Sequence, residues 1–311
     1  MRFHHGAISH DRYHNQYAHF MAKASRKACE QLEQKGRPFL LTRSACAGTQ
    51  RYSAVWTGDN ASNWKHLRMA LPCSLNLSLS GIAFNGPDVG GFMEDVTAEL
   101  LVRWHQACCL FPFFRNHSIH HSRRQEPWQF GTEPLAAIRG AIRSRYRLLP
   151  YLYQCFFNHW RNGDPVIRPL LYHYPEPEYT DLDDQYLLGD SLLVAPILHG
   201  DSQGPEIFRN GVKMQQRSIA LPPGGWFDLN RGVWLEGGRT VNYAAALDEL
   251  PLFVRDGAIV PYYAGPLHNS FMNLSDVELH LFCHNQSARL NYFVDDQESL
   301  RYQSGDIGVA D

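Results

Sequence analysis

Apolar side chains recur at helical spacing through the first half of the chain. Between Asp11 and Lys35 they fall three or four positions apart, and Gly36 followed by Pro38 ends the pattern. This spacing predicts an amphipathic helix that stops where glycine and proline interrupt it. Three later stretches are also predicted to be helical, namely residues 63–79, 97–111 and 133–160. The last of them should have a kink at Pro150.

Short apolar runs lie between these helices. The runs 38–42 (PFLLT), 53–57 (SAVWT) and 81–86 (GIAFNG) are typical of strands buried on both faces of a parallel sheet. Helices that alternate with such strands indicate a parallel α/β sheet or a barrel. After Gly163 the helical period fades, and strand-like runs alternate with turns such as Pro-Pro-Gly-Gly and Asp-Gly. The second half is therefore predicted to be antiparallel β structure.

Composition and charge narrow the class of protein. The 311 residues are 44% hydrophobic and 19% charged, which is typical of a soluble globular protein. A net charge of -2 gives no electrostatic reason to expect nucleic acid or an anionic membrane as a partner. No apolar run is long enough to span a bilayer, and no apolar signal segment follows Met1. The seven cysteines are scattered without a Cys-x-x-Cys pair, so we expect reduced thiols and a cytoplasmic protein.

Three of the predicted strands are followed by polar side chains, namely Arg43, Asp59 and Asp88. In a (β/α)8 barrel the carboxyl ends of the strands form the active-site face. Asp59 lies in the segment YSAVWTGDN, where a carboxyl beside the indole of Trp56 can have its pKa raised by desolvation and serve as a proton donor. Asp59 could equally be the N-cap of a following helix, and these nine residues alone leave both interpretations open.

Two further segments carry candidate ligand contacts. Asp88 lies in GPDVGGF, where Gly90 and Gly91 allow a ligand close to the backbone, although a simple turn residue is an alternative. Arg115 and His117 follow the aromatic run FPFF, and both must find polar partners there. A sugar hydroxyl or a carboxylate would be such a partner, and a purely structural histidine is the alternative.

Two groups of histidines raise the alternative of a metal-dependent hydrolase: His4, His5, His10 and His14, and then His117, His120 and His121. No His-Glu-x-x-His segment accompanies them, and no acidic residue is placed as an evident third ligand. The sequence also contains no glycine-rich phosphate loop and no Gly-x-Ser-x-Gly segment. We therefore expect no metal and no cofactor.

Several segments together resemble glycoside hydrolase family 31, the α-glucosidase and α-xylosidase group. The first three read RPFLLTRSACAGTQRYSAVWTGDN (37–60), GIAFNGPDVGGF (81–92) and LFPFFRNHS (110–118). The resemblance continues in the same order through DPVIRPLLY, DDQYLLGDSLLVAPIL, GGWFDL and LPLFVRDGAIVP, so it covers nearly the whole chain. It implies a retaining glycosidase with a (β/α)8 TIM barrel followed by antiparallel β-sandwich domains.

The resemblance also implies how the chain divides. A complete barrel takes about 250 residues, whereas about 160 precede the β-rich part here. The implied fold is α/β plus all-β, and it begins with the C-terminal half of a catalytic barrel at residues 1–163. A proximal β-sandwich domain at 164–270 follows, and residues 271–311 would start an incomplete distal β domain.

The resemblance assigns roles to individual residues. Asp59 would be the general acid/base of glycoside cleavage. Six residues would surround the sugar of the −1 subsite: Arg43, Trp56, Asp88, Phe92, Arg115 and His117. The indole would pack against the sugar and the phenyl ring would wall the pocket, while Asp88 and His117 bind hydroxyls with Arg115 in support. The implied substrate is an oligosaccharide with a terminal α-linked glucose or a related sugar.

The nucleophile implied by the resemblance is missing from the sequence. It should lie in a Trp-x-Asp-Met-Asn-Glu-like segment, which the 311 residues do not contain. We therefore expect a C-terminal portion that is inactive alone, with an N-terminal half or another copy of the chain covering its open barrel. A non-catalytic carbohydrate-binding remnant and the metal-dependent hydrolase stay open as other functions. Within the family a transglycosylase would differ only in its acceptor.

Overall fold

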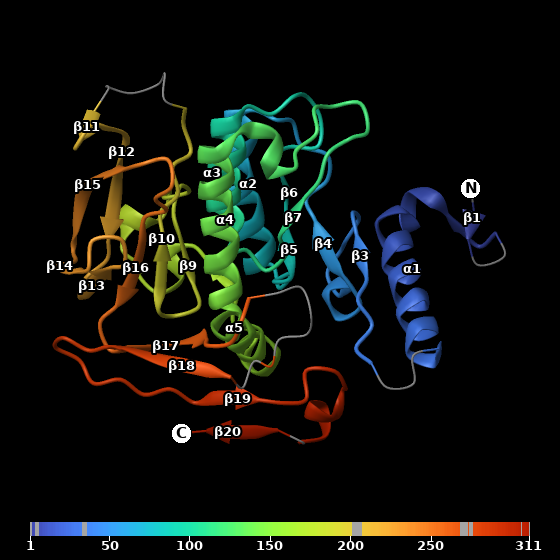
Figure 1. The fold of residues 1–311 in the computed structure, drawn as a ribbon. Helices are drawn as coiled ribbons and strands as arrows, with labels where there is room; N and C mark the ends of the chain where they lie inside the picture. Colours follow the sequence, from blue (N-terminus) through green and yellow to red (C-terminus); the bar gives the residue numbers. More distant parts are fainter. Residues whose placement is uncertain are drawn as a thin grey trace.

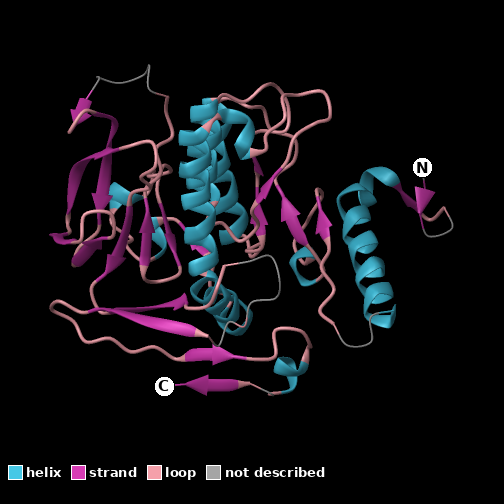
Figure 2. Ribbon diagram, viewed as in Figure 1, coloured by secondary structure: helices cyan, strands magenta, loops and turns pink. Residues whose placement is uncertain are grey.

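Helices dominate the first half of the chain and strands the second in the computed structural model (Figure 1; Figure 2). The structure describes residues 2–3, 6–32, 36–200, 207–267, 273, 276–305 and 307–310. The α-helices of these residues are α1 (His10–Leu32), α2 (Trp64–Leu79), α3 (Ala98–Cys108), α4 (Thr132–Arg147) and α5 (Leu149–Asn162). Each stretch predicted to be helical is confirmed within the described residues, and residues 33–35 of the first stretch lie outside them. The helices α4 and α5 together occupy the last stretch.

The helix boundaries follow from capping chemistry. The Asn63 side chain accepts a hydrogen bond from the backbone N–H of His66 at the start of α2, and Thr97 caps α3 in the same way. The predicted kink is instead a boundary between two helices, because α4 ends at its C-cap Leu148. Pro150 lies in the first turn of α5, where its missing N–H leaves no helical hydrogen bond unmade.

The strands of the first half are short. They are β1 (Arg2–Phe3), β2 (Ile8–Ser9), β3 (Leu41–Thr42), β4 (Ala54–Trp56), β5 (Asn85–Gly86), β6 (Asp88–Val89) and β7 (Arg115–Asn116). The order β3-β4-β5 forms a parallel sheet, and β6 pairs in parallel with β7. The prediction that residues 38–42 are buried on both faces is wrong, because β3 is an edge strand and Phe39 beside it is 60% exposed. The central strand β4 and its neighbour β5 are buried as predicted.

The second half holds antiparallel strands, as predicted. They are β8 (Ile167–Arg168), β9 (Tyr186–Leu188), β10 (Leu192–Val194), β11 (Ile207–Arg209), β12 (Val212–Leu221), β13 (Gly225–Asp228), β14 (Val233–Glu236), β15 (Arg239–Ala245), β16 (Leu252–Arg255), β17 (Ala258–Tyr263), β18 (Val277–Phe282), β19 (Tyr292–Val294) and β20 (Gly308–Ala310). Six of them form the sheet β14-β13-β16-β10-β9-β8, and β11-β12-β15 form a second sheet. The division into three domains proposed from the sequence stays a prediction.

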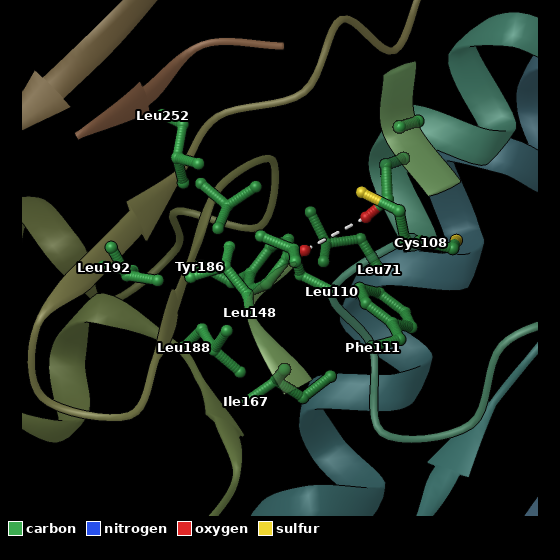
Figure 3. Close-up of a cluster of buried hydrophobic side chains, with 14 of the residues drawn as sticks. Leu71, Cys108, Leu110, Phe111, Leu148, Ile167, Tyr186, Leu188, Leu192 and Leu252 are labelled. Atoms are coloured by element: carbon green, nitrogen blue, oxygen red, sulfur yellow. Dashed lines mark hydrogen bonds between the residues drawn. The ribbon is translucent and has the colours of Figure 1, made fainter. Parts of the chain in front are cut away.

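The central strands of the six-stranded sheet, β16, β10 and β9, are buried and divide their side chains between two cores. Leu187, Leu193 and Phe253 belong to a core shared with the β11-β12-β15 sheet, which makes the two sheets a sandwich. The opposite face joins the helices, and Figure 3 shows Tyr186 of β9 among side chains from both parts. The Tyr186 hydroxyl donates to the carbonyl of Ala107 in α3 at 3.1 Å. The helical part and the sandwich therefore share one sheet as their common support.

The two ends of the described chain attach differently. Figure 1 shows α1 beyond β3, on the side away from the sandwich, and Ala22 is the buried residue of this helix. The last strands are held more firmly, because Phe293 of β19 stacks on Phe157 of α5 with ring centroids 3.8 Å apart. Arg37, just before β3, pairs with Asp295 and donates to the Tyr153 hydroxyl at 2.6 Å. One guanidinium thus joins the barrel part to the final strands.

The sandwich core predicts a large loss of stability for Leu193→Ala. Leu193 is fully buried, so its truncation should lower the free energy of unfolding by about 2–5 kcal/mol through lost burial and a cavity. The matched control is Leu281→Ala on β18, where the side chain is 66% exposed and the loss should stay below about 1 kcal/mol. Urea unfolding measures both, and equal losses would contradict the assigned core.

Candidate active site

The predicted site residues lie at the carboxyl ends of the parallel strands. Arg43 directly follows β3, and Asp59 lies three residues beyond Trp56, where β4 ends. Asp88 opens β6, and His117 directly follows β7. Because β3, β4 and β5 run in parallel, as do β6 and β7, these side chains share one edge of the barrel part. The structure therefore brings together residues that are 74 positions apart in the chain.

Asp59 is an exposed carboxylate with a cationic neighbour. Its Oδ2 lies 3.8 Å from Arg43 Nη2, and the two side chains are 37% and 60% exposed. The helix-cap interpretation of Asp59 is wrong, because the N-cap of α2 is Asn63 and not Asp59. The carboxyl group of Asp59 is therefore accessible to a ligand and does not serve to begin a helix.

Asp88 is the buried counterpart of Asp59. It has no exposed surface, and its Oδ1 accepts a hydrogen bond of 2.5 Å from Arg115 Nη2. The parallel register of β6 and β7 places Asp88 directly opposite Arg115, so the turn interpretation of Asp88 is wrong. Burial raises the pKa of Asp88, and the Arg115 guanidinium opposes that rise. Oδ2 is buried as well and accepts no hydrogen bond from the described residues.

Aromatic rings complete the group. The Arg115 guanidinium lies 5.4 Å from the ring centroid of Trp56 and 5.4 Å from that of Phe113, within the range of cation–π attraction. Phe92 stacks on His117, with ring centroids 5.2 Å apart and an angle of 26° between the planes. All seven residues proposed from the sequence thus fall into three contacting sets: Asp59 with Arg43, Asp88 with Arg115 and Trp56, and Phe92 with His117.

Two amide side chains were not among the residues proposed from the sequence. Asn60 donates from Nδ2 to the backbone carbonyl of Asp88 at 2.9 Å. Gln125 is 4% exposed and donates from Nε2 to the carbonyl of Gly91 at 2.7 Å. Asn60 directly follows Asp59 in the sequence, and this position beside a predicted site residue could have indicated a role for it. Gln125 lies in a polar stretch in which apolar residues do not recur at regular spacing, so the sequence there did not indicate that this side chain is buried.

The described residues contain no group of three or more His, Cys, Asp or Glu side chains arranged to hold a metal ion. His10 and His14 have ring nitrogens 2.9 Å apart, and His120 and His121 are neighbours on an exposed loop. His4 and His5 lie outside the described residues. The metal-dependent alternative therefore gains no support here. None of the helices in the described part is long and apolar enough to cross a membrane.

A parallel strand edge that carries carboxylates, a guanidinium and aromatic rings, followed by a β-sandwich, defines part of a TIM-barrel protein with an attached β domain. Two family models match the sequence in the expected order. The Glycosyl hydrolases family 31 TIM-barrel domain matches residues 1–155, and the Glycosyl hydrolase family 31 C-terminal domain matches residues 163–260. The chain belongs to glycoside hydrolase family 31.

Similar proteins agree with this family. The chain is 40% identical over 301 residues to Alpha-glucosidase 2 of Bacillus thermoamyloliquefaciens and 39% identical over 303 residues to Neutral alpha-glucosidase C of Mus musculus. Each match covers 96% of this chain but 36% and 33% of the relative. The chain thus spans about a third of the length of these curated relatives.

Two solved structures have the same fold over nearly the whole chain. One is the family 31 dextranase of Flavobacterium johnsoniae complexed with glucose, with a TM-score of 0.84, 31% identity, and coverage of 99% of this chain and 38% of that one. The other is a glucosidase II alpha subunit bound to Tris, with a TM-score of 0.86, 30% identity, and coverage of 98% and 33%. These similarities confirm the fold expected from the sequence.

The buried pair predicts a pH-dependent loss of stability for Arg115→Ala. Because the pKa of Asp88 is raised, its contribution to stability is present below the ordinary carboxyl pKa and is lost as the pH rises through the folded value. Removing the cation raises that folded value further. The variant should therefore lose about 3 kcal/mol of unfolding free energy at pH 7 and less at pH 4.

Chemical unfolding at the two pH values checks this expectation. The control is the double variant Arg115→Ala with Asp88→Asn, in which no charge is buried and the pH dependence should disappear. An equal loss for the single variant at both pH values would contradict the assigned pairing of these two side chains.

Proposed function

We propose that the chain carries the acid/base half of the active site of a retaining α-glucosidase. The observation behind this proposal is the shared strand edge at which Asp59 and Arg43 stand beside the buried Asp88–Arg115 pair. The family and the α-glucosidases among its relatives support the substrate class, a terminal α-linked glucose of an oligosaccharide.

Asp59 is the proton carrier in this proposal. As an acid it protonates the oxygen of the leaving group, and as a base it then takes a proton from the water that releases the sugar. Its exposure lets both the leaving group and water reach the same carboxyl. Arg43 Nη2 lies 3.8 Å from the same carboxyl, so a cation stands beside the group that would carry the proton.

The remaining residues hold the sugar in the −1 subsite. Asp88 Oδ2 accepts a sugar hydroxyl, since its other oxygen is occupied by Arg115. Trp56 offers an aromatic face to the C–H side of the ring, and Arg115 lies over that indole. His117 offers a ring nitrogen to a second hydroxyl, with Phe92 stacked on it as the pocket wall.

We place the nucleophile on a segment outside these 311 residues. The second carboxylate of the group, Asp88, is buried and bound to Arg115, which makes it a poor nucleophile. The chain alone should then bind the sugar without cleaving it, and a barrel-completing segment or partner would restore turnover. Sugar binding without turnover even after such completion would favour the carbohydrate-binding alternative. Cytoplasmic location stays a prediction, since a similar solved structure is of an ER glucosidase II complex.

Complementation tests the proposal. The 311 residues would replace the matching segment of the Bacillus Alpha-glucosidase 2, and the chimera should hydrolyse phenyl α-glucoside while the chain alone does not. Asp59→Asn should lower kcat/KM of the chimera by about 10²–10⁴-fold, the range of general acid–base catalysis. Asp181→Asn, a change at an exposed acid far along the chain, is the matched control and should leave the rate unaltered.

Two outcomes would count against the proposal. Turnover by the chain alone that depends on Asp59 would contradict the external nucleophile. A folded chimera that is active in the Asp59→Asn form would instead remove the acid/base role.

A further inference from the structure

Asn60, the residue after Asp59, joins two loops that carry the site. Its side chain donates from Nδ2 to the carbonyl of Asp88 and accepts at Oδ1 from the backbone N–H of Phe92, each at 2.9 Å. Its backbone carbonyl also accepts from the N–H groups of Phe92 and Met93, each at 2.9 Å. Both polar atoms of the amide are therefore bound to the backbone of segment 88–93.

Segment 88–93 needs support from outside because its centre is glycine. Gly90 and Gly91 have φ angles of 92° and 91°, a region that favours glycine, and glycine gives the backbone the most freedom to move. The packing also excludes side chains here. A Cβ on Gly91 would lie 2.5 Å from the backbone of Ser62, and one on Gly90 would lie 2.1 Å from Gln125 Oε1.

Gln125 supports the same segment from the opposite side. Its Nε2 donates to the carbonyl of Gly91 at 2.7 Å, and Asn116 Nδ2 donates to the carbonyl of Gln125 at 2.8 Å. Gln125 therefore fastens the glycines to the loop after β7, whereas Asn60 fastens the ends of the segment to the loop that carries Asp59. Of the two amides, only Asn60 connects the sugar-contact residues to the proton carrier.

We propose that Asn60 is a positioning residue that sets the distance between Asp59 and the sugar-contact groups of Asp88 and Phe92. This inference rests on the proposed function and deepens it. A general acid works only within hydrogen-bond reach of the leaving oxygen, and a shift of about 1 Å can cost about 10²-fold in rate. Both polar atoms of the Asn60 amide already bind backbone groups of segment 88–93, so its effect passes through the two loops.

Amide hydrogen exchange on the 311-residue chain tests the connection itself. Asn60→Ala should speed exchange of the Phe92 and Met93 amides by about tenfold or more, while amides of α2 and of the β12–β15 sheet stay within about twofold. Asn60→Asp keeps the acceptor for Phe92 and should preserve most of that amide's protection. Asn76→Ala, at an exposed asparagine on α2, is the matched control and should change none of these rates.

Kinetics of the chimera separates positioning from mere loop stability. A misplaced acid costs most when the leaving group needs protonation, so Asn60→Ala should lower kcat/KM about tenfold more on phenyl than on 4-nitrophenyl α-glucoside. In Asn60→Asp, the extra loss of kcat/KM on phenyl α-glucoside should be smaller than in Asn60→Ala. A variant that only loosens the protein would lose the same factor on both substrates.

Each result decides a separate claim. Unchanged exchange at Phe92 and Met93, or faster exchange throughout the chain, overturns the connection between the loops. Equal losses on the two aryl glucosides overturn the positioning role even if exchange rises locally. An inactive wild-type chimera would count against the proposed function, while the exchange experiment would still decide whether Asn60 holds the two loops in register.

Discussion

The pairing of β6 with β7 sets Asp88 opposite Arg115, and the rest of the site depends on that contact. A carboxylate without solvent contact is costly unless a charge and hydrogen bonds compensate it. Arg115 supplies both and also lies over the ring of Trp56 at the end of β4. One guanidinium thereby ties three strand ends together, and the sugar-contact groups keep their spacing because of it.

The site combines a buried half with an exposed half. Asp88 is closed off from water and fixed by Arg115, whereas Asp59 and Arg43 are open to solvent. This division suits a glycosidase, because sugar recognition needs fixed hydrogen-bond groups and proton transfer needs access for a leaving group and for water. Asn60 bonds to Asp88 and Phe92, on either side of the glycines at 90 and 91, and in the proposed site it connects the recognition half to the proton-transfer half.

The strand edge that carries the site is supported by the helices and by the six-stranded sheet. The six-stranded sheet faces the helices on one side and a second sheet on the other, so its central strands β16, β10 and β9 are buried. The Tyr186 hydroxyl bonded to α3 shows how closely the two parts are joined. Polar loops can then hold a site, because the strands and helices behind them are fixed by packing.

Local patterns in the sequence predicted much of this architecture. The helices could be located because apolar period and capping residues such as Thr97 agree with each other. The burial of 38–42 was mispredicted because a run of apolar letters does not tell an edge strand from a central one. The motifs pointed to all seven site residues through the family resemblance.

Contacts between distant segments could not be predicted. The guanidinium of Arg115 over Trp56 joins residues 59 positions apart, and only the pairing of strands brings them together. Gln125 was missed for the same reason, since its burial against Gly91 depends on how the loop after β7 folds back. Asn60 was overlooked despite its position next to Asp59, because its contacts with residues 88–93 depend on how the two loops meet.

The central claim is that Asp59 is the acid/base of a retaining mechanism. Azide rescue of the Asp59→Ala chimera on α-glucosyl fluoride tests this claim most directly, because fluoride departs from this substrate with little help from an acid. Loss of the acid/base in a retaining enzyme leaves the glycosyl-enzyme intermediate open to azide, so the account predicts α-glucosyl azide with retained configuration. No rescue, or β-glucosyl azide as the product, would contradict it, since inversion marks loss of the nucleophile instead.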